Sequence, residues 1–205
     1  PKTLAPKEVA PYADAGLTAY RAVKKATRHL LPGESVVVIG AGGLGHIAVQ
    51  CLKAMCAADV IVVDKSDDSL KLAGKIGADK LVKADGNEVE AVLALTGGAG
   101  AEAVIDFVGE KGTTAKGLAM TRPMGSYYVV GYGENITVPT VDMVITEKNI
   151  IGNLVGTWAE LVELMALADR GLVDLTTVEY TLADANRALQ DLNAGKIHGR
   201  AVLIP

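Results

Sequence analysis

Residues 35–45 read Ser-Val-Val-Val-Ile-Gly-Ala-Gly-Gly-Leu-Gly. The apolar, β-branched run that opens this stretch is typical of a strand buried on both faces. The glycines that follow have the spacing G-x-G-x-x-G. Gly40 permits a tight turn out of the strand, Gly42 lets a pyrophosphate approach the backbone, and Gly45 lets a helix pack closely on the strand. The start of that helix would also direct unpaired N–H groups at the phosphates.

The surroundings of this turn support a dinucleotide site, because glycine spacing alone is weak support. Residues 47–55 carry apolar side chains at helical spacing, and residues 60–63 read as a second strand that ends at Asp64. Asp64 lies nineteen positions after Gly45, near the expected offset of about 20 for a ribose-binding acid. A carboxylate there accepts hydrogen bonds from the ribose hydroxyls. It repels a 2′-phosphate by about 4 kcal/mol per charge pair at 4 Å.

We therefore expect NAD(H) rather than NADP(H) as the ligand, although Lys65 reduces this preference because it can meet a phosphate. The alternative is that the glycines serve only the geometry of the chain. His46, in the first turn of the helix, could face the site, but we expect a partly exposed packing residue.

Composition narrows the class of protein. The chain has 205 residues, 50% of them hydrophobic, and a net charge of −4 without a basic block, which argues against nucleic acid or an anionic membrane as partner. No signal peptide or apolar run of about 20 residues is visible. Cys51 and Cys56 lie on different faces of one predicted helix, which suits neither a disulfide nor a metal pair, so we expect a reduced, cytoplasmic protein. The first residue is Pro1, and we expect the sequence to begin at a cut.

Strands and helices alternate beyond Asp64, which predicts a doubly wound parallel α/β sheet of six strands, the Rossmann arrangement. The remaining expected strands are 80–82, 103–106, 125–130 and 149–151, with a final strand at 200–204. The expected helices are 17–28, 66–75, 88–95, 113–120, 158–170 and 182–193. Ligands of such sheets bind beyond the carboxyl ends of the strands.

Five segments in a fixed order carry a resemblance to a known family: 14–20 (Asp-Ala-Gly-Leu-Thr-Ala-Tyr), 40–50, 74–79, 96–101 and 198–205 (His-Gly-Arg-Ala-Val-Leu-Ile-Pro). Together they resemble the zinc-dependent medium-chain alcohol dehydrogenases, particularly bacterial enzymes that interconvert secondary alcohols and ketones. The resemblance covers only the carboxyl-terminal part of the family's pattern. It implies that residues 1–16 connect to a mostly absent catalytic domain, that 17–170 bind NAD, and that 171–205 return toward the catalytic domain.

The resemblance also implies roles for individual residues. Thr18, Leu154 and Val155 would lie at the nicotinamide, and Phe107 and Val108 beside the adenine ribose. The pyrophosphate contacts would come from Gly42, Gly43, Leu44 and Arg200, beside the turn glycines Gly40 and Gly45. Trp158 departs from the Arg or Asn of many relatives and leaves the local cofactor contacts open.

A metal ligand is the last role that the resemblance implies. Asp14 occupies the position of the third zinc ligand, and carboxylate oxygen is an accepted ligand of zinc. The residues alone favour Asp14 as the cap of the following helix, and the resemblance favours the ligand in the complete protein. The family's other two ligands, a Cys and a His, belong to the amino-terminal domain, and no catalytic residue is assigned in this chain.

The implied activity is hydride transfer between NAD(H) and a secondary alcohol, ketone or aldehyde, with zinc as a Lewis acid in the complete enzyme. One alternative is a zinc-free quinone or enoyl reductase, which would favour NADP. The other is an isolated NAD-binding module without catalytic activity. By the same resemblance we expect a homodimer or homotetramer joined through the sheet edge, at residues 126–151.

Overall fold

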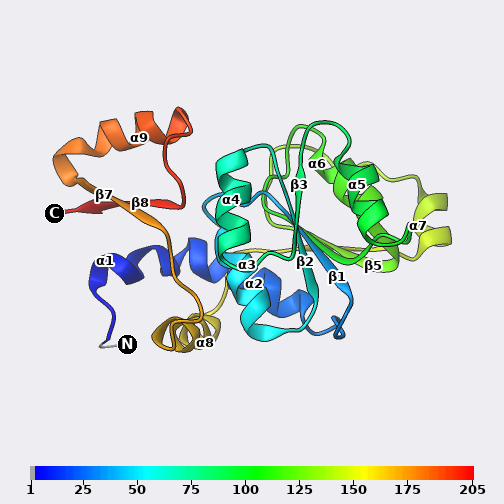
Figure 1. The fold of residues 1–205 in the computed structure, drawn as a ribbon, viewed down its shortest axis with the longest axis horizontal. Coiled ribbons are helices and arrows are strands. Elements are labelled where there is room, and N and C mark those ends of the chain that lie inside the picture. Colours follow the sequence, from blue (N-terminus) through cyan, green and yellow to red (C-terminus); the bar gives the residue numbers. More distant parts are fainter. Residues whose placement is uncertain (1–2) are drawn as a thin grey trace.

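The computed structural model describes residues 3–205, and its centre is a parallel sheet of six strands in the order β3-β2-β1-β4-β5-β6 (Figure 1). The strands are β1 (Ser35–Ile39), β2 (Asp59–Asp64), β3 (Lys80–Lys83), β4 (Ala101–Asp106), β5 (Thr121–Val129) and β6 (Asn149–Gly152). The sequence-based fold class, a doubly wound parallel α/β sheet, is confirmed. Its order reverses between β1 and β4, the place where open α/β sheets bind ligands.

Helices cover both faces of this sheet. They are α2 (Ala15–Ala26), α3 (Gly45–Met55), α4 (Asp67–Lys75), α5 (Glu88–Leu95), α6 (Thr113–Met120), α7 (Thr140–Thr146) and α8 (Trp158–Asp169). Alternate residues of β1 belong to two separate apolar cores. Val36 and Val38 pack with side chains of α2, α3 and α8, and Val37 and Ile39 pack with those of α5 and α6. This alternation explains the continuous apolar run of β1, because both of its faces are buried.

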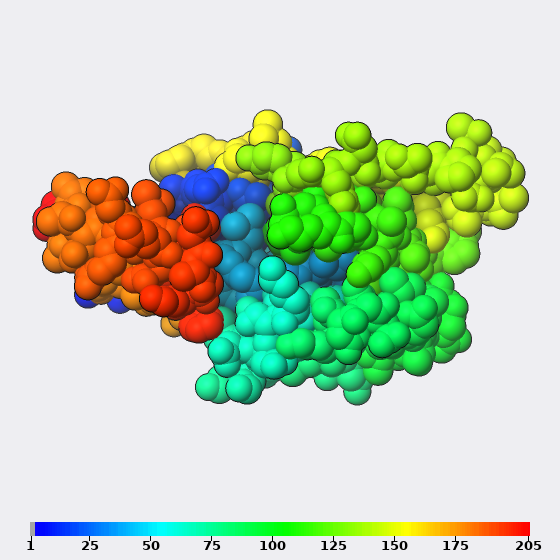
Figure 2. All heavy atoms as spheres, turned by 90° about the horizontal axis from the view of Figure 1, so that it is seen from above, coloured from blue at the N-terminus to red at the C-terminus, as the bar shows by residue number. Residues whose placement is uncertain are grey.

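A smaller lobe is built by the carboxyl-terminal residues. In it β7 (Thr177–Thr181) pairs in parallel with β8 (Arg200–Ile204), and η2 (Leu182–Asp184) and α9 (Ala185–Asn193) connect them. Figure 2 shows these orange and red atoms gathered at one end of the molecule, beside blue atoms of the amino-terminal segment. The strand β7 was not predicted, and within the described residues it pairs with β8, which follows α9.

The amino-terminal residues are more ordered than a simple connection requires. They form α1 (Pro6–Val9) and the 3-10 helix η1 (Ala10–Ala13). Tyr12 is buried, and its hydroxyl donates to the carbonyl of Val173 at 2.8 Å. The segment is thereby attached to the residues that lead into the carboxyl-terminal lobe.

Two further differences from the predicted elements concern β5 and α7. Strand β5 begins at Thr121, four residues before its expected start, and a register shift between Ala101 and Ala103 accommodates the extra residues. Residues 140–146 form a helix after Pro139, although their β-branched composition favours a strand. None of the helices found between residues 3 and 205 has the length and apolarity that a membrane crossing requires.

Candidate functional site

The glycine turn lies at the carboxyl end of β1, and two of its glycines are required by close contacts within the chain. Gly40 has a φ of +86°, and a Cβ there would lie 2.7 Å from a methyl of Val108. A Cβ on Gly45 would lie 1.8 Å from the carbonyl oxygen of Gly40, so only glycine allows α3 to start so near the strand. At Gly42, in contrast, a Cβ would meet nothing within 4 Å. The space beside Gly42 is therefore open.

The backbone amides of this turn are free to bind an anion. Those of Gly42, Gly43 and Leu44 have no acceptor among residues 3–205, and no side chain caps the start of α3. The positive end of the dipole of α3 points at the same place. Free amides with a helix dipole behind them form a phosphate-binding arrangement.

Asp64 faces this turn. Its Oδ2 accepts the N–H of Ala41 at 2.7 Å, and its Oδ1 accepts the N–H of Ser66 at 2.7 Å. The half-buried carboxylate is thus fixed from both sides at the carboxyl end of β2. Each oxygen accepts one bond from the chain and keeps capacity for another.

A pocket of about 260 Å³ opens beside Asp64. Four of the predicted site residues line it: Gly40, Asp64, Lys65 and Val108. Sequence reasoning missed other lining residues, among them Glu88 and Lys116, whose side chains form an ion pair. These two residues are 28 positions apart, and nothing in the sequence indicates that they meet.

The turn after β4, which carries Phe107 and Val108, is held by Asp106. Its buried Oδ1 accepts the N–H groups of Val108 and Gly109 at 2.8 and 3.0 Å, and its Oδ2 accepts the hydroxyl of Tyr127 at 2.7 Å. The N–H of Phe107 donates to the carbonyl of Ile39 at 3.0 Å. These bonds place the turn against Gly40.

Arg200 reaches the glycine turn from the small lobe. Its guanidinium Nη1 lies 2.9 Å from the position that a Cβ of Gly43 would take. The first residue of β8 therefore brings a cation beside the free amide of Gly43. His46 lies in the first turn of α3 and is fully buried, so our expectation of a partly exposed residue is wrong. Its burial is tolerated because Nδ1 has a partner, the carbonyl of Gly42 at 2.7 Å.

Thr18, Leu154 and Val155 lie outside this pocket, on α2 and in the loop that joins β6 to α8. Thr18 is buried in the first turn of α2, whereas Leu154 is 83% exposed. Val155 has a φ of +31°, an unfavourable conformation for a β-branched residue. Backbone strain of this kind clusters at functional sites.

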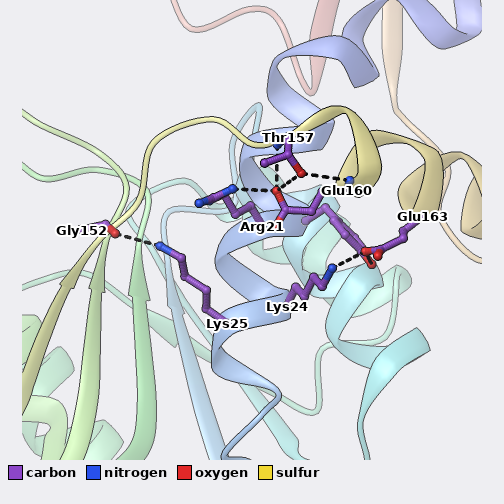
Figure 3. A network of polar contacts seen from close by, with 8 residues as sticks. Arg21, Lys24, Lys25, Gly152, Thr157, Glu160 and Glu163 are labelled. Atoms are coloured by element: carbon purple, nitrogen blue, oxygen red, sulfur yellow. Dashed lines mark hydrogen bonds and ion pairs between the residues drawn. The ribbon is translucent and has the colours of Figure 1, made fainter.

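A polar network fixes this loop to α2 (Figure 3). Arg21 pairs with Glu160 at 2.7 Å, Lys24 pairs with Glu163 at 2.6 Å, and Lys25 donates to the carbonyl of Gly152 at 3.0 Å. The hydroxyl and N–H of Thr157 donate to the same oxygen of Glu160 at 2.9 and 2.8 Å. The helix that carries Thr18 is thereby joined to both ends of the loop that carries Leu154 and Val155.

Asp14 is the residue before α2, and it is exposed. Its side chain makes no capping hydrogen bond, so the structure does not support the interpretation of Asp14 as a side-chain cap. Among residues 3–205, no three His, Cys, Asp or Glu side chains are grouped to hold a metal. Within the described residues, Asp14 therefore has no neighbouring His, Cys, Asp or Glu cluster to join.

A larger, mostly apolar groove of about 610 Å³ lies elsewhere, between η1 and α8. Its lining includes Tyr12, Trp158 and Met165, with Asp169 as its one charged residue. Its lining holds no group of charged side chains comparable with the one around Asp64. The edge beyond β1 and β2 is therefore the better candidate for a functional site.

Known proteins match the chain along nearly its whole length. The sequence profile of the family described as zinc-binding dehydrogenase matches residues 43–170. An NAD-dependent alcohol dehydrogenase from Sulfolobus acidocaldarius is 39% identical over 98% of this chain. An alcohol dehydrogenase from Geobacillus stearothermophilus is 35% identical over 99% of this chain. The chain spans 59% of the length of each of these two relatives.

The solved structure of the alcohol dehydrogenase from Aeropyrum pernix superposes on the whole chain with a TM-score of 0.96 at 45% identity, and the match covers 60% of that protein. One relative has a different cofactor in its name, a D-arabinose 1-dehydrogenase (NADP⁺) from Saccharolobus solfataricus that is 30% identical. The family profile covers well over half of the chain, and its matched residues run from the glycine turn to the end of α8. The chain accordingly belongs to the zinc-binding dehydrogenase family.

Proposed function

We propose that this chain is the NAD(H)-binding part of an NAD-dependent alcohol dehydrogenase. In the complete protein, hydride would pass between NAD(H) and a secondary alcohol, ketone or aldehyde. The cofactor supplies the hydride chemistry when bound, and the residues of this chain hold and orient it. The names of the relatives from Sulfolobus acidocaldarius and Geobacillus stearothermophilus support this activity for the whole protein.

The observation that carries the proposal is the position of the Asp64 carboxylate beside the glycine turn. Asp64 accepts the N–H of Ala41, and the next three amides of the turn have no acceptor in the described chain. One carboxylate next to a row of free amides matches the two parts of a dinucleotide that border each other, a ribose and a pyrophosphate. A ribose donates to the carboxylate, and the pyrophosphate accepts from the amides.

We also propose roles for the other residues, in line with the family resemblance. Gly42, Gly43, Leu44 and Arg200 would bind the pyrophosphate, and Phe107, Val108 and Lys65 would border the adenosine. Thr18, Leu154 and Val155 would line the nicotinamide side, next to the substrate domain of the complete protein. The predicted division at residues 16 and 170 is part of this proposal.

The test is a comparison of NADH and NADPH binding by fluorescence titration, in the wild type and in Asp64→Ala. We expect the variant to lose NADH affinity and to improve its relative affinity for NADPH, because the charge that repels the 2′-phosphate is gone. Equal losses for both ligands would mean that the substitution only damages the turn. Unchanged NADH affinity would refute the ribose assignment.

Asp67→Ala is the matched control for this titration. Asp67 is an exposed carboxylate three positions away, pairs with Lys83 and does not line the pocket. Its loss should leave the affinities for NADH and NADPH unchanged.

The same titration tests the NADP-dependent alternative, which one relative's name and the position of Lys65 in the pocket favour. A wild type that prefers NADPH would support that alternative.

Zinc belongs to the proposal only for the complete protein, where Asp14 would supply one ligand. Its exposed carboxylate, without a capping bond, is compatible with this role. Elemental analysis of the complete protein and of its Asp14→Ala variant tests it. A complete protein without zinc would favour the zinc-free reductase, and one that binds NADH but converts no alcohol would favour an isolated module.

We also propose that two copies associate through β6 and α7. β6 is an edge strand of the sheet, and α7 exposes Val141, Val144 and Ile145, an apolar group that a monomer would leave in water. Light scattering should detect a dimer or tetramer, and Ile145→Glu should dissociate it. A wild type that stays monomeric at high concentration would count against this surface. We propose in addition that the protein is cytoplasmic, as its cysteine usage predicts.

A further inference from the structure

His46 is buried at the base of the glycine turn, and one of its ring nitrogens has a defined partner. Nδ1 lies 2.7 Å from the carbonyl oxygen of Gly42, which also accepts the backbone N–H of His46 at 3.3 Å. Nε2 is buried and has no hydrogen-bond partner among residues 3–205. A carbonyl only accepts, so Nδ1 carries the proton and Nε2 does not when the ring is neutral.

The direction of the Gly42 carbonyl decides the direction of the next amide. The peptide that joins Gly42 and Gly43 is planar and trans, so its C=O and N–H point in opposite directions. A carbonyl held toward α3 by His46 therefore turns the N–H of Gly43 outward. That N–H is free, and it borders the open space next to Gly42 and the guanidinium of Arg200.

This peptide needs an external constraint because glycines flank it. Glycine has access to more of φ/ψ space than any other residue, so the peptide between Gly42 and Gly43 can rotate at low cost. A rotated peptide would present its carbonyl oxygen to the phosphates and repel them. The bond from Nδ1 opposes this rotation more directly than the long backbone bond does.

We infer that His46 is a positioning residue for the pyrophosphate of the dinucleotide, acting through the Gly42 carbonyl to keep the Gly43 N–H directed at the ligand. The inference rests on the proposed NAD(H)-binding function. It assigns a role to a side chain that does not itself touch the cofactor, and it requires the neutral ring with the proton on Nδ1.

The surroundings of the ring favour this neutral state. Burial lowers the pKa of His46, while the bond to Gly42 opposes this, and the nearby charges are Arg200 on β8 and Asp174 before β7, whose effects have opposite signs. The backbone of Asp174 is tied to the same helix by Gln50, whose side chain bonds its N–H and carbonyl at 2.8 and 2.7 Å. Within residues 3–205 no carboxylate accepts a bond from Nε2, so a second proton on the ring would have no partner there.

The experiment compares His46→Leu with His46→Asn, and NADH with adenosine, which lacks phosphates. Leucine fills the ring's volume without a donor, whereas the Nδ2 of asparagine takes the place of Nδ1 and can bond the same carbonyl. We expect His46→Leu to weaken NADH binding by about fivefold or more, the equivalent of one net hydrogen bond, and to leave adenosine binding unchanged. His46→Asn should restore most of the NADH affinity.

A second measurement does not depend on the stability of any variant. Nitrogen NMR of the wild type reports the ring tautomer directly, and the inference requires the Nδ1–H form. Val49→Ala serves as the control variant, because Val49 is fully buried on the same helix and is four positions beyond Gly45. Its core cavity should lower stability without changing the NADH affinity.

Three results would overturn the inference: an Nε2–H tautomer, wild-type NADH affinity in His46→Leu, or equal losses of NADH and adenosine affinity in that variant. The last result would indicate a merely structural role. A wild type that binds no NADH at all would instead refute the proposed function. The two failures are therefore distinguishable.

Discussion

Substitution of Gly42 and Gly45 by alanine should separate ligand binding from folding within one turn. At Gly45, the new Cβ would lie 1.8 Å from the Gly40 carbonyl oxygen and 2.8 Å from its carbon, both of them backbone atoms that no rotamer change can move. Overpacking of this kind costs about 3 kcal/mol or more. That is a large part of the roughly 5–15 kcal/mol that stabilises a typical domain. Gly45→Ala should therefore unfold at much lower urea concentration than the wild type.

Gly42→Ala should give the opposite result. A Cβ there meets nothing within 4 Å, and Gly42 is not among the glycines with positive φ, so alanine fits without strain. Alanine has less conformational freedom than glycine in the unfolded chain. The free energy of unfolding should therefore stay the same or rise by about 0.4–1 kcal/mol. The added methyl would occupy the space assigned to the pyrophosphate, and we expect NADH affinity to fall tenfold or more, about 1.4 kcal/mol.

Urea unfolding, monitored by far-UV circular dichroism, measures the stability of each variant. Titration with NADH measures its affinity for the ligand. The reasoning predicts one variant with lost stability and another with lost binding at wild-type stability. Wild-type NADH affinity in Gly42→Ala would show that the dinucleotide does not lie against this turn. Wild-type stability in Gly45→Ala would show that α3 and β1 are not as close as described.

Three further predictions concern the supports of the site. Tyr127→Phe should lower the free energy of unfolding by about 1–3 kcal/mol, measured by urea unfolding, because it leaves the buried Oδ2 of Asp106 without its donor. A double-mutant cycle on Arg21 and Glu160, both mostly buried, should give a coupling energy of about 1 kcal/mol, and a value of zero would contradict the pairing in Figure 3. Although burial opposes it, hydrogen bonds from Thr157 and Arg21 lower the pKa of Glu160 below its ordinary 4.5. The stability that this carboxylate contributes is complete above about pH 4.5 and is lost as the pH falls through the folded-state pKa, so Glu160→Gln should flatten the acid limb of the unfolding profile.

The sheet and its glycine turn could be predicted from sequence because their signals are local. An apolar run, a glycine spacing and an acid at a fixed offset all fall within residues 35–64, and each has one physical meaning in that order. Two side-chain pairs in and near the pocket carry no such signal. Asp106 meets Tyr127 across two strands, and Glu88 meets Lys116 across two helices. Their residue types are as common on an exposed helix or strand as in a buried pair.

Helix α7 and strand β7 were missed for two different reasons. Val141, Val144 and Ile145 favour a strand by propensity, but they form a short helix whose apolar side chains remain exposed. The residues of β7 are exposed or only half-buried, so no buried face marks the strand. Its strand hydrogen bonds are made with β8, which comes later in the chain. His46 was misjudged because its partner, the Gly42 carbonyl, is a backbone group and leaves no trace in the sequence.

The proposed phosphate site is assembled from parts that belong to different units of the chain. The free amides come from the β1–α3 turn, the carboxylate that borders them comes from β2, and the cation beside Gly43 comes from β8 in the small lobe. The contact between Gly43 and Arg200 is close enough that a side chain on Gly43 would displace the guanidinium. A bound pyrophosphate would therefore contact both lobes at once. It follows that cofactor binding and the position of the small lobe are thermodynamically linked, because a ligand that binds one arrangement more tightly must also stabilise that arrangement.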